Sequence, residues 1–243
     1  ESINCLPKTA WPPTWRGMGM SVIVEQAICE IKLLANNVPD GKHIVTGDIR
    51  KLSARLYRGI KDKTIDNVLS ICDELLREHS WGLGVIAFDW AYRVKAQYSE
   101  DTYEVFYGWL KNYVRGWGDC DDFCTHAFGE LLRRYKSLFS KVMAWTKDED
   151  FWIRRASAVI LIPAILHDDY EGIAPLIISD LLMADKHDLV QKGYGWMLKS
   201  LSQVDKESVT NYLIDNHTQM PRTAYRYALE KYDKETRKKL MSL

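Results

Sequence analysis

The sequence predicts an all-α fold, an α-solenoid of paired antiparallel helices. Apolar residues recur at helical spacing along most of the chain, and the alternation typical of strands is almost absent. Helical segments rich in alanine, aromatic residues and arginine also recur, each preceded by another amphipathic segment, at steps of 36, 35, 38 and 31 residues. They open at Trp81, Trp117, Trp152, Val190 and Pro221. Helix pairs repeated about every 30 to 45 residues are typical of HEAT-like and armadillo-like superhelices, whose concave face binds elongated partners.

The first 19 residues differ from the rest of the chain. Three of the seven prolines fall within 1–19, and no apolar periodicity runs through this stretch. We expect an irregular or partly ordered arm there, either functional or ahead of a native start at Met18 or Met20. Residues 20–243 are then expected to form a single HEAT-like helical-repeat domain.

Apolar spacing and end signals predict the individual helices of that domain. A helix over 21–36 is stopped by a run that contains two asparagines, a proline and a glycine. A second, over 48–60, carries four aliphatic residues on one stripe, and a third, over 64–79, begins at a capping threonine. Further helices are expected at 81–97, 101–115, 119–136, 137–145, 150–166, 171–184, 187–203, 205–216, 220–231 and 233–241.

The segment 158–165 is the best rival for a strand, because it is a continuous apolar run. The residues that lead into it, 151–156, have helical spacing instead. We therefore expect a helix that is kinked near its end at Pro163.

Composition excludes several classes of protein. Apolar residues make up 47% of the chain, enough for a full core, and 33 basic residues balance 33 acidic ones. This balance argues against a disordered charged tail and removes the simplest argument for nucleic-acid binding, a high isoelectric point. No apolar run is long enough to span a bilayer, and no signal peptide is expected. Five cysteines, an odd number, indicate free thiols in a reducing compartment.

Local charge departs from this balance at both ends of the predicted repeat domain. Residues 41–63 hold seven basic and two acidic side chains, and residues 217–243 hold seven and three. Clustered cations on one face can bind phosphates even when the total charge is zero. A solvated face with no partner is the alternative.

The densest motif covers residues 116–124, Gly-Trp-Gly-Asp-Cys-Asp-Asp-Phe-Cys. Trp117 and Asp121 are four residues apart, so they share a face of a helix. In the alternative interpretation, Asp119 is an N-cap and the next two aspartates only favour the positive end of the helix dipole. Cys120, Cys124 and His126 do not have the spacing of a zinc site, and we expect no metal and no cofactor.

Two further motifs follow. Arg154 and Arg155 point about 100° apart on a helix, so one can face the concave surface. Ordinary ion pairing with the acidic residues at 148–150 is the alternative. Gly193 and Gly195 interrupt a helical pattern, which lets a backbone or a ligand come close, or else permits tight helix packing with Trp196 in the core.

These motifs, in this order, resemble the DNA alkylation repair glycosylases of the AlkD type, which are HEAT-like solenoids. The family pattern W-x-x-C/V-D-x-F/I-C is similar to residues 117–124, W-x-x-R-A to 152–156, K-x-x-G-W-x-L to 192–198 and R-x-A-x-R-Y-A-x-E-K to 222–231. The likeness covers about 20–243.

The resemblance implies a glycosylase that removes cationic N3- and N7-alkylated purines, such as 3-methyladenine and 7-methylguanine, from double-stranded DNA. It implies a monomer with no membrane partner, cytoplasmic and of bacterial type, acting at the nucleoid. It makes Asp121 the catalytic carboxylate and places Trp117, Trp196, Arg155, Lys192 and Lys199 on the DNA, with Arg155 at a phosphate.

Two departures from the family pattern leave alternatives open. Gly116 stands where the family often has a second aromatic or small polar residue. Asp122 follows Asp121 directly, so a slip of one residue would make Asp122 the carboxylate. A second function is also compatible with the repeats, an inert HEAT-like scaffold that binds DNA or a protein.

Overall fold

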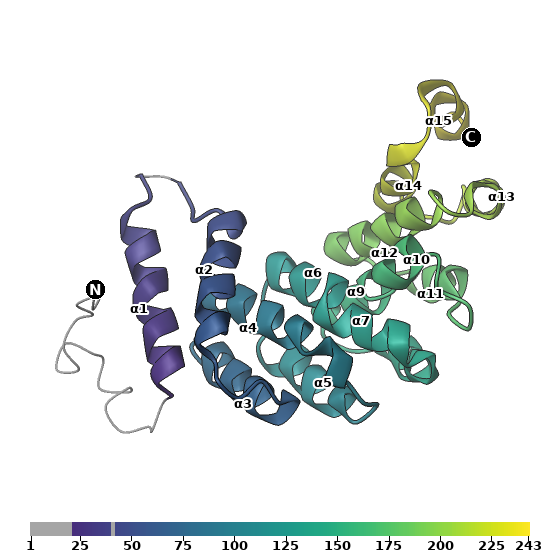
Figure 1. Cartoon of the computed structure of the whole chain (residues 1–243). Helices are drawn as coiled ribbons and strands as arrows, with labels where there is room; N and C mark the ends of the chain where they lie inside the picture. The colour runs from purple at the N-terminus through teal and green to yellow at the C-terminus, as the bar shows by residue number, and fades with distance from the viewer. Residues whose placement is uncertain (1–20, 40–41) are drawn as a thin grey trace. The chain divides into compact units, whose positions relative to one another are not determined.

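The computed structural model describes residues 21–39 and 42–243 and confirms the all-α prediction (Figure 1). No strand occurs in the part of the chain that it describes. Across those same residues, no helix combines the length and the apolar character needed to cross a membrane. The predicted arm at 1–19 lies outside the described residues.

The chain divides into two compact units, residues 1–97 and 98–243. In the first unit, α4 packs against α1, α2 and α3, and its buried Trp90 donates a hydrogen bond to the Ser53 carbonyl (3.1 Å). Its elements are α1 (Val22–Asn36), α2 (Thr46–Gly59), α3 (Ile65–Leu76), α4 (Trp81–Arg93) and the 3-10 helix η3 (Lys95–Gln97). The single-domain prediction for 20–243 stays a prediction.

The second unit carries all of the motifs singled out above from Trp117 onward. Phe106, Phe123 and Phe128 form the centre of its first core, with ring centroids 5.3 to 5.5 Å apart. Its elements are α5 (Thr102–Asn112), α6 (Trp117–Thr125), α7 (Ala127–Arg134), η4 (Lys136–Leu138), α8 (Phe139–Trp145), α9 (Phe151–Val159), α10 (Ile162–Leu166), α11 (Pro175–Leu182), α12 (Asp188–Leu201), α13 (Lys206–Asn216), α14 (Arg222–Ala228), η5 (Leu229–Lys231) and α15 (Lys234–Met241).

Four of these helices form a row, in which α6 packs on α9, α9 on α12 and α12 on α14 (Figure 1). Helices α7, α10, α11 and α13 pack against members of this row. Each row helix opens at or next to one of the recurring segments predicted from the sequence. The repeat pattern therefore places the motif residues on adjacent helices.

Two predicted helices are each broken in two. The expected helix over 119–136 is interrupted at His126, whose backbone (φ −124°, ψ −94°) is not helical. The Thr125 hydroxyl donates to the Asp121 carbonyl (2.6 Å), and the His126 ring nitrogen lies 2.9 Å from the Asp122 carbonyl, so side chains take helix acceptors. The expected helix over 150–166 divides into α9 and α10, and Pro163 lies in the first turn of α10, where it needs no N–H.

The prediction of five free thiols is wrong for Cys29. Cys29 is disulfide-bonded. Cys72, Cys120 and Cys124 are free and buried. Composition could not separate these cysteines, since burial and pairing depend on which segments meet in the fold.

Candidate functional site

The first two turns of α6 bring an exposed indole and a carboxylate to the same face of that helix. Gly116 is the N-cap, so the helix begins three residues earlier than the interpretation of Asp119 as N-cap required. Trp117 is 64% exposed, and Asp121 follows one turn later. Cys120, Phe123 and Cys124 of the same helix are buried, so they anchor it to the core.

Arg155 of α9 forms a bidentate ion pair with Asp121. Arg155 Nε donates to Asp121 Oδ1 (3.0 Å), and Arg155 Nη2 donates to Asp121 Oδ2 (2.9 Å). This fork-to-fork geometry fixes the plane of the carboxylate and is stronger than a single neutral hydrogen bond. The side chain of Asp121 keeps 18% of its exposure, and that of Arg155 keeps 6%.

Arg155 is held in turn by α12. Its Nη1 donates to the carbonyl of Leu189 (2.5 Å), so the three described hydrogen bonds use three of the five guanidinium N–H groups. A Cβ at Gly193 would lie 3.1 Å from Arg155 Cγ. Because Gly193 has no side chain, there is room for the Arg155 side chain between α9 and α12.

The two adjacent aspartates have different surroundings. Burial raises the pKa of Asp121 above its ordinary value, and the charge and hydrogen bonds of Arg155 oppose that rise. The Asp122 carboxylate points elsewhere, with its Oδ1 3.3 Å from the ring nitrogen of His126. Asp121 is thus the aspartate that faces the next helix of the row.

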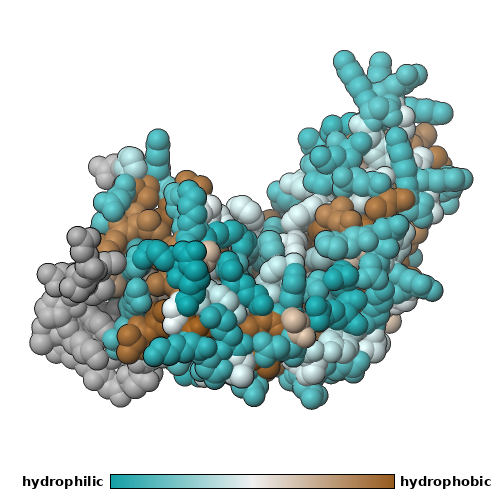
Figure 2. Space-filling view, viewed as in Figure 1, coloured by the Kyte–Doolittle hydropathy of each residue, from teal (hydrophilic) through white to brown (hydrophobic). Residues whose placement is uncertain are grey.

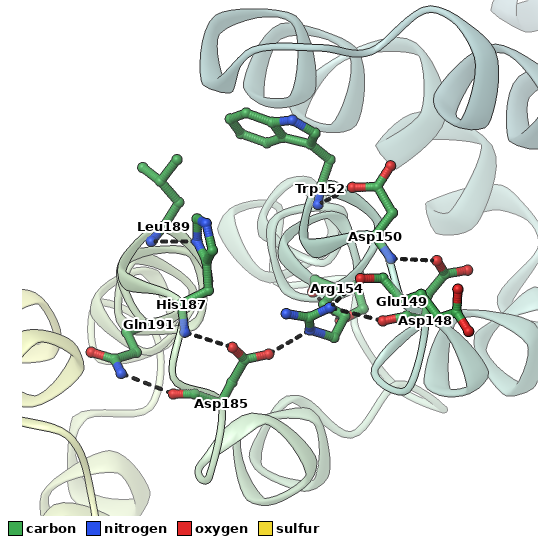
Figure 3. Close-up of polar contacts among 10 residues, drawn as sticks. Asp148, Glu149, Asp150, Trp152, Arg154, Asp185, His187, Leu189 and Gln191 are labelled. Atoms are coloured by element: carbon green, nitrogen blue, oxygen red, sulfur yellow. Dashed lines mark hydrogen bonds and ion pairs between the residues drawn. The ribbon is translucent and has the colours of Figure 1, made fainter.

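Arg154 does not contact Asp121, and it links the segment before α9 to the segment before α12. Its Nε donates to Asp185 Oδ2 (2.6 Å), and its Nη1 donates to the carbonyls of residues 148 and 149 (2.9 Å each). Asp185 also accepts from the His187 backbone N–H (2.8 Å), and His187 Nδ1 accepts from the Leu189 N–H (3.3 Å) as the N-cap of α12. Figure 3 shows this chain of contacts, with the Trp152 indole directed away from Arg154.

The remaining predicted residues lie on α12. The Trp196 side chain is half-buried. Lys192 pairs with Asp188 (2.6 Å) and Lys199 with Glu230 (2.7 Å), so both lysines hold surface ion pairs. The structure joins Asp121 and Arg155 by direct contact, whereas the two lysines pair with other carboxylates, Asp188 and Glu230.

Sequence reasoning missed the Leu189 carbonyl and the Arg154–Asp185 link. A backbone carbonyl such as that of Leu189 leaves no mark in the sequence, because any residue supplies one. Residues 154 and 185 lie 31 positions apart, so no local motif connects them. The reason for Gly193 was also open, although its place inside a helix pattern was a signal. Gly195 has a different reason, since a Cβ there would lie 2.7 Å from Tyr227 Cβ and 2.8 Å from the Ala224 carbonyl.

Comparison with known proteins assigns most of the chain to one family. The family model for DNA alkylation repair enzymes matches residues 43–232, more than three quarters of the chain. The solved structure of a predicted DNA alkylation repair enzyme from Enterococcus faecalis is similar in fold, with a TM-score of 0.61, 15% identity, and coverage of 87% of this chain and 95% of that one. A search of curated proteins finds no match. The family match over most of its length shows that this chain belongs to the DNA alkylation repair enzyme family.

Proposed function

We propose that the protein is a DNA glycosylase that hydrolyses the N-glycosyl bond of cationic N3- and N7-alkylated purines in duplex DNA. One observation carries the proposal above all others. A carboxylate with a raised pKa, clamped by a buried arginine, lies one helical turn from a tryptophan that is 64% exposed. Family membership supports a role in alkylation repair, and the substrate and the reaction are part of the proposal.

The chemistry of such a lesion requires little from the protein. A purine alkylated at N3 or N7 already carries a positive charge, so it leaves without a general acid. The bond breaks toward an oxocarbenium-like sugar, and a fixed carboxylate stabilises that developing cation and orients or deprotonates the attacking water. Asp121 is proposed for this role.

Trp117 and Trp196 are proposed as the aromatic surfaces for the cationic nucleotide. The face of an indole ring is electron-rich and attracts a cation or positively polarised C–H groups. The large exposure of Trp117 leaves its ring free to meet DNA, and Trp196 contributes a half-buried ring from α12.

Arg155 is proposed chiefly as the group that orients Asp121 and keeps it ionised. Its burial and its bonds to Asp121 and Leu189 fit that role, and two of its N–H groups remain for a phosphate. Lys192 and Lys199 are proposed as phosphate contacts. Lys192 can leave its exposed ion pair at little cost, because solvent screens the attraction.

The test is release of 7-methylguanine from methylated duplex DNA by the purified chain, measured under single-turnover conditions. We expect release well above the spontaneous rate. If no release occurs while duplex DNA still binds, the inert scaffold becomes the better account of the fold.

A further inference from the structure

A polar cleft lies one helix beyond the Asp121–Arg155 pair along the row, between α12, α14 and α15. Its volume is about 350 Å³, and side chains from all three helices line it, among them Asp188, Lys192, Thr223, Arg226, Glu230 and Arg237. A water molecule occupies about 30 Å³ in the liquid, so the cleft has room for a group much larger than one water. Figure 2 shows a hydrophilic surface over α14 and α15 on the face in view.

The two helices α12 and α14, which both line this cleft, pack closely against each other. Gly195 of α12 has no side chain, so the backbone of α14 approaches it closely at Ala224 and Tyr227. On α14, the lining residues lie at positions i, i+3 and i+4, which is one face of a helix. They are Thr223, Arg226 and Tyr227, and Glu230 follows in η5.

The charges in the cleft do not cancel. Its two carboxylates each have a lysine partner, Asp188 with Lys192 (2.6 Å) and Glu230 with Lys199 (2.7 Å). Within the described residues, neither Arg226 nor Arg237 has an ion pair within 4.0 Å. In the described part of the chain, two guanidinium groups from different helices thus line the cleft without a carboxylate within ion-pair distance, which favours an anion there.

We propose that this cleft binds phosphodiester groups of a nucleic-acid strand, which deepens and rests on the proposed action on DNA. The guanidinium fork matches the geometry of phosphate oxygens and forms two parallel hydrogen bonds to them. The Thr223 hydroxyl adds a neutral donor of the kind that commonly contacts the DNA backbone. Because Arg237 lies beyond residues 43–232, α15 adds a wall that the family match does not cover.

The experiment measures affinity for an undamaged duplex by fluorescence anisotropy over a series of salt concentrations. The test variant is Arg226→Gln with Arg237→Gln. The matched control is Lys231→Gln with Lys238→Gln, which removes the same charge from exposed positions that do not line the cleft. We expect the slope of log K against log salt to become shallower by about 0.9 for each lost phosphate contact in the test variant, and to change little in the control.

Equal losses in the two variants, or no loss in either, would overturn the cleft as a site. A second arm titrates the wild type with inorganic phosphate alone. Saturable binding of inorganic phosphate that is abolished in the test variant, with DNA affinity unchanged, would assign the cleft to a small anion and overturn the strand. Because binding is measured on undamaged DNA, these outcomes stay distinguishable from a failure of glycosylase activity.

Discussion

Asp121 and Glu130 are two carboxylates of the second unit, and arginine binds both. Glu130 of α7 is 6% exposed and accepts from Arg133 (2.9 and 3.0 Å) and from Arg134 (3.0 Å). These arginines lie three and four residues later on the same helix. Asp121 is more exposed, at 18%, and its single arginine comes from 34 residues away on another helix of the row.

These differences in exposure and in arginine partners distinguish the Glu130 ion pair, which stabilises the fold, from the Asp121 ion pair, whose carboxylate remains accessible to a reactant. Glu130 has its charge compensated within two turns of α7, and Arg133 also contacts Asp169 (2.8 Å). Asp121 lies beside an exposed aromatic side chain and retains access to solvent. Arginine contact alone therefore does not distinguish the two carboxylates, and the proposed site depends on arginine contact together with partial exposure and a neighbouring aromatic face.

The largest effect is expected from Arg155→Leu. It leaves the Asp121 carboxylate half-buried without its partner, and the loss of one member of a buried pair destabilises by about 3 to 5 kcal/mol. We expect the lower end of that range, because Asp121 keeps some contact with water. Urea unfolding measures the stability, and excision per folded molecule should fall more than tenfold. Unchanged stability would contradict the assigned geometry.

The next largest effects are expected from alanine substitutions at the two glycines of α12, Gly193 and Gly195. At Gly195 a Cβ would meet backbone at 2.8 Å, so Gly195→Ala should destabilise by about 1 to 3 kcal/mol through overpacking. At Gly193 the closest atom to the Cβ would be Arg155 Cγ at 3.1 Å, and the nearest backbone atom lies at an ordinary 3.6 Å, so Gly193→Ala should cost less stability. It should still displace the guanidinium and slow excision. Urea unfolding and single-turnover excision together test this, and the reverse order of stability losses would contradict it.

The acid side of the pH–rate profile gives a smaller but specific effect. In the proposed mechanism excision needs the Asp121 carboxylate ionised, and burial raises its pKa above the ordinary 3.8. The rate should therefore fall with decreasing pH around a midpoint above 3.8. Since the charge of Arg155 lowers this pKa, Arg155→Gln should move the midpoint still higher. Single-turnover rates corrected for spontaneous release measure both midpoints, and a midpoint below 3.8 would be inconsistent with the proposed carboxylate.

The sequence predicted the parts of this account that depend on periodicity. Helical spacing and the repeat steps predicted the row, and the four-residue interval predicted that Trp117 and Asp121 share a face. It did not predict the break at His126, which depends on side chains that take backbone acceptors. The Leu189 carbonyl and the Arg154–Asp185 link were out of reach for the same physical reason, because they arise only when separate helices meet.

The smallest effect is expected from Asp122→Asn. Its carboxylate faces His126 rather than Arg155, so removal of its charge should leave the excision rate within about twofold of wild type. Loss of activity in this variant, with Asp121→Asn still active, would move the proposed role by one residue.

Single-turnover excision by Asp121→Asn, compared with Glu130→Gln, tests the central claim most directly. Both substitutions keep the shape of the side chain and remove the charge. We expect Asp121→Asn to slow excision by about a hundredfold or more while affinity for DNA holds or rises slightly, because the carboxylate acts on the transition state. Glu130→Gln should lower the stability and leave the rate per folded molecule unchanged. Equal rates for Asp121→Asn and wild type, at equal folded fractions, would contradict the account.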